Sequence, residues 1–190
     1  YCEEKRKAAV IDSVLDFDPA SGEITNEFVN SQIKYIKTHS LELIYILETH
    51  AHADHLTAAN FLKKQFPNSK TGIGEGIKNV QKIFKDVFNF GIDFSITGSQ
   101  FDLLLTEADV LKLGNQQIKV HNVPGHTEDS VCYEVAENVF LGDTMFAPEY
   151  GTARCDFPGG DSRKLSDSIQ KIFSLGANKL IGRAQGRYRC

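Results

Sequence analysis

The first half of the chain alternates between short apolar runs and stretches in which apolar residues recur at helical spacing. We expect strands at residues 8–12, 41–48 and 71–74, and helices at residues 26–38, 56–66 and 80–88. The last helix would place five apolar side chains on one face: Val80, Ile83, Phe84, Val87 and Phe88. That spacing predicts a face that packs into the core and does not serve a cofactor.

From residue 110 the pattern changes to short β segments separated by turn residues, which is typical of hairpins. These segments span residues 110–113, 117–123, 131–135 and 139–141. A helix around residues 165–173 and a strand at residues 179–181 complete the pattern. No repeat or long linker divides the chain, so we expect one mixed α/β (α+β) domain over residues 1–190.

Four metal-binding side chains fall within six residues just after the strand predicted at residues 41–48: His50, His52, Asp54 and His55. One histidine beside a strand is usually an ordinary polar residue, but four such groups at one strand-to-helix turn predict a metal site. Alternate residues of an extended segment point the same way. His50 and His52 could therefore share one ion, with Asp54 and His55 facing a second.

Two later residues are also of metal-binding types. His126 follows Pro124-Gly125, and Asp143 comes directly after an apolar run. Taken singly, each has an ordinary alternative, because a turn histidine can bond local backbone and a turn aspartate can cap a helix. Together with the cluster, they predict that metal ligands converge at one edge of a sheet, where open α/β sheets place their sites.

The order and spacing of H-x-H-x-D-H, G-H-T and G-D resemble the metallo-β-lactamase fold superfamily over nearly the whole chain. Residues 150–161 more narrowly resemble its persulfide dioxygenase-like branch, which includes bacterial β-lactamase-like hydrolases. The resemblance implies an αββα sandwich of two mixed sheets flanked by helices. It also implies one Fe(II) ion bound by His50, His126 and Asp143, with His52, Asp54 and His55 as supporting groups or as further ligands in dinuclear relatives.

The same resemblance implies a reaction and its reactants. Glutathione persulfide would be oxidised by dioxygen to sulfite and glutathione. Arg154 would bind a glutathione carboxylate, because a guanidinium matches a carboxylate fork, and Asp156 would orient it. A structural ion pair between Arg154 and Asp156 is an equally strong interpretation of these two residues.

Two other functions stay open. Relatives carry a late histidine that completes a second metal site, whereas this chain has no histidine after His126. A dinuclear Zn(II) hydrolase of glutathione thioesters, similar to glyoxalase II, would need that ligand. The basic tail and the start at Tyr1 also allow a truncated, non-catalytic metal-binding homologue, and we expect the natural protein to be longer at both ends.

Composition removes several classes of function. Twenty-one basic and twenty-five acidic residues give a net charge of −4, which disfavours nucleic-acid binding. No apolar run reaches the roughly twenty residues that cross a membrane. The four cysteines form no C-x-x-C pair, which favours reduced thiols and a cytoplasmic or mitochondrial matrix location. A small thiol substrate is then the expected partner, and a homo-oligomer stays open.

Overall fold

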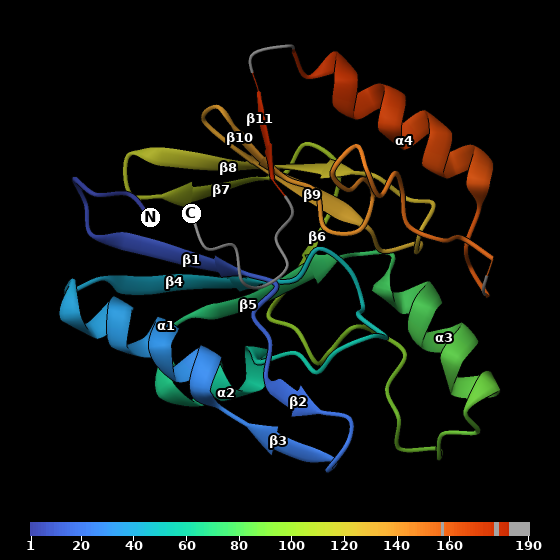
Figure 1. The fold of residues 1–190 in the computed structure, drawn as a ribbon, viewed down its shortest axis with the longest axis horizontal. Coiled ribbons are helices and arrows are strands. Elements are labelled where there is room, and N and C mark those ends of the chain that lie inside the picture. Colours follow the sequence, from blue (N-terminus) through green and yellow to red (C-terminus); the bar gives the residue numbers. More distant parts are fainter. Residues whose placement is uncertain (157, 177–178, 183–190) are drawn as a thin grey trace.

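Two β-sheets face each other in the computed structural model, with helices on their outer sides (Figure 1). The structure describes residues 1–156, 158–176 and 179–182. The first sheet has the order β1-β4-β5-β6, and its three pairs of neighbours are all parallel. Its strands are β1 (Lys7–Ile11), β4 (Glu42–Leu47), β5 (Lys70–Gly74) and β6 (Leu103–Leu105).

The second sheet is mixed and has the order β11-β10-β9-β8-β7. Its strands are β7 (Val110–Leu113), β8 (Gln116–Asn122), β9 (Val131–Val135), β10 (Asn138–Phe140) and β11 (Leu180–Gly182). Neighbours are antiparallel except for β10 and β11. A separate two-stranded ribbon pairs β2 (Asp16–Asp18) with β3 (Glu23–Thr25).

Three apolar layers hold these elements together. Helices α1 (Glu27–Thr38) and α2 (Ala59–Gln65) pack on the first sheet through a cluster that includes Val29, Ile46 and Leu62. Leu47 and Tyr133 belong to the layer between the two sheets. Helix α4 (Ser162–Ser174) covers the second sheet, where Ile172 joins that sheet's apolar residues. Burial of this apolar surface is the main force that stabilises the sandwich.

The expected αββα sandwich is confirmed, and so are the helix and strand types predicted from the pattern. Three elements were missed: β2, β3 and β6. Each has only three residues, which is too short for periodicity to show. The tail at residues 183–190, which carries the basic ending, lies outside the described residues, as does Phe157. Within the described part of the chain, no helix has the length and apolarity needed to span a membrane.

Helix α3 (Ile77–Val87) stands at one end of the first sheet, beside the loops that follow β4 and β8 (Figure 1). The turn before it passes very close to the loop between β8 and β9. A Cβ atom on Gly74 would lie 2.1 Å from the carbonyl oxygen of Asp129, and one on Gly76 would lie 2.3 Å from that of Glu128. Glycine at both positions therefore allows α3 to stand beside the candidate site.

Candidate metal centre

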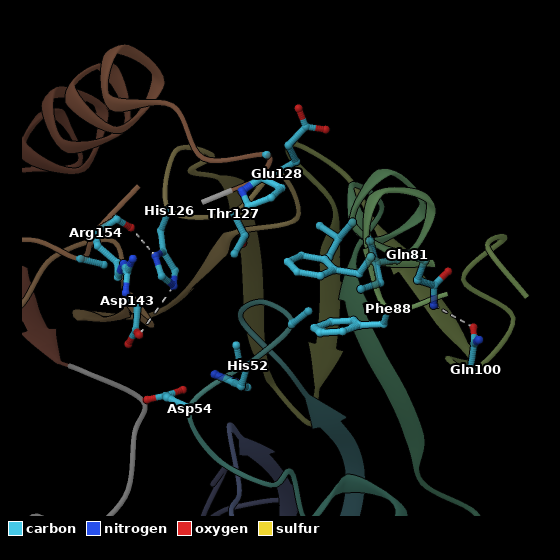
Figure 2. Close-up of a pocket in the computed structure, with 18 of the residues that line it drawn as sticks. His52, Asp54, Gln81, Phe88, Gln100, His126, Thr127, Glu128, Asp143 and Arg154 are labelled. Atoms are coloured by element: carbon cyan, nitrogen blue, oxygen red, sulfur yellow. Dashed lines mark hydrogen bonds and ion pairs between the residues drawn. The ribbon is translucent and has the colours of Figure 1, made fainter. Parts of the chain in front are cut away.

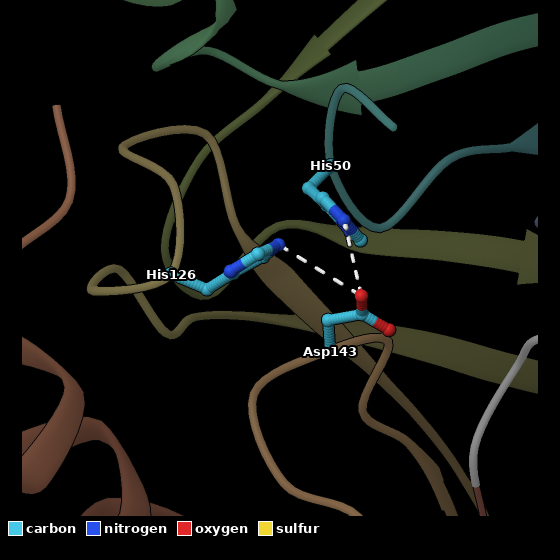
Figure 3. Close-up of side chains that lie close together, drawn as sticks. All are labelled: His50, His126 and Asp143. Atoms are coloured by element: carbon cyan, nitrogen blue, oxygen red, sulfur yellow. Dashed lines mark ion pairs between the residues drawn. The ribbon is translucent and has the colours of Figure 1, made fainter. Parts of the chain in front are cut away.

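His50, His126 and Asp143 come from three separate strand ends. His50 follows β4, His126 lies in the loop after β8, and Asp143 follows β10. The two facing sheets bring these ends together at one edge of the sandwich, which agrees with the general location of ligand sites in α/β sheets. Figure 3 shows the three side chains pointing toward one another from separate loops.

The geometry of this triad suits one ion. Nε2 of His50 and Nε2 of His126 lie 3.9 and 3.8 Å from the same atom, Oδ2 of Asp143 (Figure 3). The three ligand atoms all lie within 4.8 Å of one another. Their side chains are only 2, 13 and 9% exposed in that order. Two imidazoles and one carboxylate on one face form a donor set that both iron and zinc accept.

Hydrogen bonds fix the orientation of both imidazoles. Nδ1 of His126 lies 2.7 Å from the carbonyl oxygen of Arg154, which can only accept, so Nδ1 carries the proton. Nδ1 of His50 lies 3.0 Å from Oγ1 of Thr49, whose own hydroxyl donates to Asp12. That hydroxyl must therefore accept from His50. In the neutral form of either ring, Nε2 then keeps its lone pair, as a metal ligand requires.

His52 faces a different set of groups. Its Nε2 lies 3.1 Å from Oδ1 of Asp12 and 3.3 Å from Oε2 of Glu48, two carboxylates that are almost fully buried. Burial alone would lower the pKa of His52, but its contacts with the acceptor oxygens of Asp12 and Glu48 and the negative charges of these carboxylates raise it to about 10. Among the described residues, the ligand atoms of His50 and His52 therefore fall into different sets. His50 lies with His126 and Asp143, and His52 lies with other groups.

Asp54 and His55 lie at the mouth of the site. Oδ1 of Asp54 is 3.9 Å from Nε2 of His55, and the rings of His55 and His52 have centroids 4.2 Å apart. His52, Asp54 and His55 form a second set whose ligand atoms lie within 4.8 Å of one another. Asp54 is 61% exposed and His55 is 17% exposed, so this set is far more open to water than the triad.

Three buried acidic residues support the site, although sequence reasoning gave none of them a role. Asp12 accepts from the backbone N–H of Thr49 at 2.7 Å, and Asp129 accepts from that of Ala51 at 2.8 Å. Glu48 accepts from the hydroxyl of Thr57, and its carbonyl accepts from Tyr133 at 2.7 Å. The available signal was an acidic residue directly after, or at the end of, an apolar strand, as in Asp12 and Glu48.

A cavity of about 1120 Å³ opens beside the triad. His126, Asp143, Asp54 and Arg154 line one side, and the apolar face of α3 lines the other (Figure 2). This corrects the expectation that the whole α3 face packs into the core. Val80, Phe84 and Phe88 all line the cavity, and whereas Val80 is buried, Phe88 is 60% exposed.

Arg154 and Asp156 form a two-pronged ion pair. Nε of Arg154 donates to Oδ1 of Asp156 at 2.7 Å, and an Nη atom donates to Oδ2 at 3.2 Å. Both side chains are 71% exposed. This hydrogen bonding, in which Arg154 donates and Asp156 accepts, raises the pKa of Arg154 and lowers the pKa of Asp156. Arg154 lines the cavity, and its carbonyl oxygen also accepts from His126.

A profile of the Metallo-beta-lactamase superfamily matches residues 3–183. The chain belongs to this superfamily. Metallo-beta-lactamase relatives of known sequence include "Glyoxylase B2" of Dictyostelium discoideum, which is 47% identical over 174 residues. The "Probable metallo-hydrolase" of Burkholderia pseudomallei is 44% identical over 179 residues, and human "Persulfide dioxygenase ETHE1, mitochondrial" is 28% identical over 181 residues.

These alignments cover 91, 89 and 94% of this chain, but only 60, 60 and 58% of the respective relatives. The chain therefore spans about 60% of the length of these superfamily members. Among solved structures, ETHE1 from Myxococcus xanthus superposes with a TM-score of 0.71 at 24% identity, over 96% of this chain and 66% of that one. BLEG-1 B3 metallo-beta-lactamase gives 0.72 at 26% identity, over 98 and 84%.

Proposed function

We propose that this chain oxidises a persulfide with dioxygen, using one ferrous ion held by His50, His126 and Asp143. The main observation behind the proposal is that the first two histidines of the cluster have different partners. His50 joins the triad, whereas His52 is hydrogen-bonded to the buried carboxylate of Asp12 and lies 3.3 Å from that of Glu48. Two histidines and one carboxylate with open positions are the ligand set of non-haem Fe(II) oxygenases.

The residues present suit such an ion. In their neutral forms, both triad imidazoles present Nε2 to the ion. Asp143, whose side chain is 9% exposed, adds a carboxylate. When bound, Fe(II) would supply a redox-active Lewis acid at which the sulfur and dioxygen can meet. The remaining chemistry depends on the residues that hold, orient and admit the reactants.

The proposed reaction balances as R–S–SH plus O₂ plus H₂O giving R–SH, sulfite and two protons. The outer sulfur loses four electrons and dioxygen gains them, while the S–S bond breaks and the inner sulfur leaves as the thiol. Asp54 lines the cavity and is 61% exposed, so its carboxylate connects the site with solvent and can carry protons away. Thr49 and the carbonyl of Arg154 keep the two triad imidazoles in the metal-binding orientation.

Glutathione persulfide is the reference substrate of this proposal. Arg154 stands at the cavity rim and would bind one of its carboxylates, with Asp156 fixing the guanidinium plane. Binding would require the carboxylate to share the guanidinium with Asp156, which already occupies two of its N–H groups. A reducing compartment, such as cytoplasm or mitochondrial matrix, would keep this substrate available.

A zinc-dependent hydrolase of glutathione thioesters is the second candidate function. The observation that favours it is the second set of ligand atoms formed by His52, Asp54 and His55, which could hold another ion beside the triad. The relatives named Glyoxylase B2 and metallo-hydrolase also have higher identity to this chain than the persulfide dioxygenase does. In such a hydrolase, ions held by these residues would supply a hydroxide for attack on the thioester carbonyl.

The test is anaerobic reconstitution with ferrous iron, followed by oxygen uptake and sulfite release on addition of glutathione persulfide. We expect iron-dependent uptake with one sulfite formed per O₂, lost in His126→Ala. The zinc form is assayed in parallel with S-lactoylglutathione. Thioester cleavage without oxygen uptake would establish the hydrolase instead, and neither activity in a folded, metal-loaded sample would indicate a non-catalytic homologue.

A further inference from the structure

The wall of the cavity opposite the triad is mainly hydrocarbon, with the side chains of Gln81 and Gln100 beside it. Helix α3 contributes Ile77, Val80 and Phe84, and the adjoining residues contribute Phe88, Phe94 and Phe101. Figure 2 shows aromatic rings from this side projecting toward the space between α3 and His126. The same surface continues outward, because Phe88 lies between Phe84 and Phe90 with ring centroids 5.5 Å from each.

Specific hydrogen bonds hold the segment that follows α3 against that helix. Gln81, which is 8% exposed, accepts from the backbone N–H of Gly98 at 2.9 Å and donates to Gln100 at 2.9 Å (Figure 2). Lys85 donates to the carbonyl oxygen of Phe94 at 3.0 Å. These contacts place the rings of Phe94 and Phe101 on the cavity side, so the apolar wall is a built feature of the fold.

The cavity offers few partners for the charged groups of glutathione. Its ionised lining groups, apart from histidine, are Asp54, Glu128, Asp143 and Arg154. The one cation of this set is ion-paired with Asp156, and Glu128 is paired with Lys164 at 3.6 Å. Glutathione carries two carboxylates and one ammonium group. Arg154 could meet one carboxylate, but on the α3 side the other charged groups would lie against hydrocarbon.

We infer that the wall formed by α3, Phe94 and Phe101 binds a hydrocarbon substituent of the sulfur substrate, so that the preferred substrate is an alkyl persulfide. That the substrate is a persulfide rests on the proposed function. That the wall binds hydrocarbon rests on the cavity lining alone. The sulfur lies at His50, His126 and Asp143, and the alkyl chain extends along Phe84 and Phe88. Burial of each methylene against these rings favours the longer chain.

Binding is measured first, without oxygen, so that it does not depend on turnover. Anaerobic calorimetry on the Fe(II)-loaded full chain compares 1-hexanethiol, 2-mercaptoethanol and glutathione. The first two share a thiol and differ mainly in the hydrocarbon chain. We expect 1-hexanethiol to bind at least about tenfold more tightly than either of the others. Equal or weaker binding of 1-hexanethiol would overturn the inference.

Two variants then test where the alkyl chain of the ligand binds. Phe88→Ala removes a ring that is 60% exposed, and Phe173→Ala on α4 removes one that is 57% exposed and outside the cavity lining. We expect Phe88→Ala to weaken 1-hexanethiol binding by roughly five- to tenfold and to leave 2-mercaptoethanol binding unchanged, whereas Phe173→Ala changes neither. Equal effects of the two variants, or equal losses for both thiols in Phe88→Ala, would contradict the assigned wall.

Turnover separates this inference from the proposed function. If the iron form oxidises persulfides, hexyl persulfide should show a higher kcat/KM than glutathione persulfide, and Phe88→Ala should remove that preference mainly through KM. The opposite preference would overturn the inference while leaving the dioxygenase in place. If no persulfide is oxidised, the proposed function fails, and the thiol-binding comparison alone decides whether the wall binds hydrocarbon.

Discussion

Oδ1 of Asp12 lies 3.1 Å from Nε2 of His52, and the other oxygen of the same carboxylate accepts from the hydroxyl of Thr49 at 2.7 Å. Because Thr49 in turn accepts from His50, one buried carboxylate sets the orientation of two histidines. Asp12 is 1% exposed and has a φ of 47°, a left-handed conformation that few residues adopt without a specific contact. The residue that directly follows β1 therefore orients His50 through Thr49 and contacts His52 directly.

Replacing Asp12 by Asn should lower metal affinity about 10- to 100-fold, because the chain of hydrogen bonds that orients His50 through Thr49 loses its charged acceptor. The measurement is competition with a chelator, followed by metal content per chain. Asp167→Asn, an exposed position on α4, is the matched control and should keep the affinity of the parent. Equal affinities for all three proteins would show that Asp12 does not orient the ligands.

Glu48→Gln should raise the zinc content of the protein from about one ion toward two per chain. Oε2 of Glu48 lies 3.3 Å from Nε2 of His52, and loss of its charge weakens the attraction that draws this imidazole away from Asp54 and His55. Mass spectrometry of the intact metal-loaded protein counts the ions. If the number of bound ions stays the same as in the parent, Glu48 does not limit ion binding by His52, Asp54 and His55.

Gly142→Ala should destabilise the protein and weaken metal binding together. A Cβ atom there would lie 2.2 Å from Oγ1 of Thr49, and the φ of +56° already disfavours alanine. Gly22→Ala separates these causes, because Gly22 has a φ of +73° but no atom within 4 Å of the added Cβ. We expect Gly22→Ala to cost about 1 kcal/mol in chemical denaturation and to leave metal binding intact.

Gly142→Ala should cost at least about 1 kcal/mol more than Gly22→Ala, because Thr49 must move to relieve the contact. Thr49 bonds His50, so that movement should also reduce metal content. Equal stabilities of the two variants, with equal metal content, would show that the loop after β10 adapts without disturbing the site.

Asp102→Asn should lower the thermal stability of the protein in a manner that depends on pH. The hydrogen bond from Lys63 and those from Thr71 lower the pKa of Asp102, so the folded state favours the ionised form. This stabilisation is present above the unfolded-state pKa of about 3.9 and is lost as the pH falls through the folded-state value. Tm measured from pH 7 to pH 3 should show a gap between parent and variant that closes at low pH. A difference in Tm that stays the same at every pH would show that the loss of stability comes from packing and not from the charge of Asp102.

Much of the fold could be predicted from local patterns. The run at residues 41–48 and the helical spacing of α3 each reflect a periodicity within a single segment, and both elements formed where expected. The missed strands β2, β3 and β6 have three residues each, and the pairing partner stabilises so short a strand more than its own sequence does. The αββα arrangement was predicted through the resemblance of the metal-binding motifs.

The sequence by itself determined that His50, His52, Asp54 and His55 share one turn, because their spacing along the chain is fixed covalently. Only the tertiary structure decided which of them faces which partner, because Asp12, His126 and Asp143 reach the site from other strands. The same holds for Phe84 and Phe88, whose helical spacing indicates an apolar face but cannot say whether protein or a cavity covers it. Periodicity records which side chains share a face, and only packing determines what lies against that face.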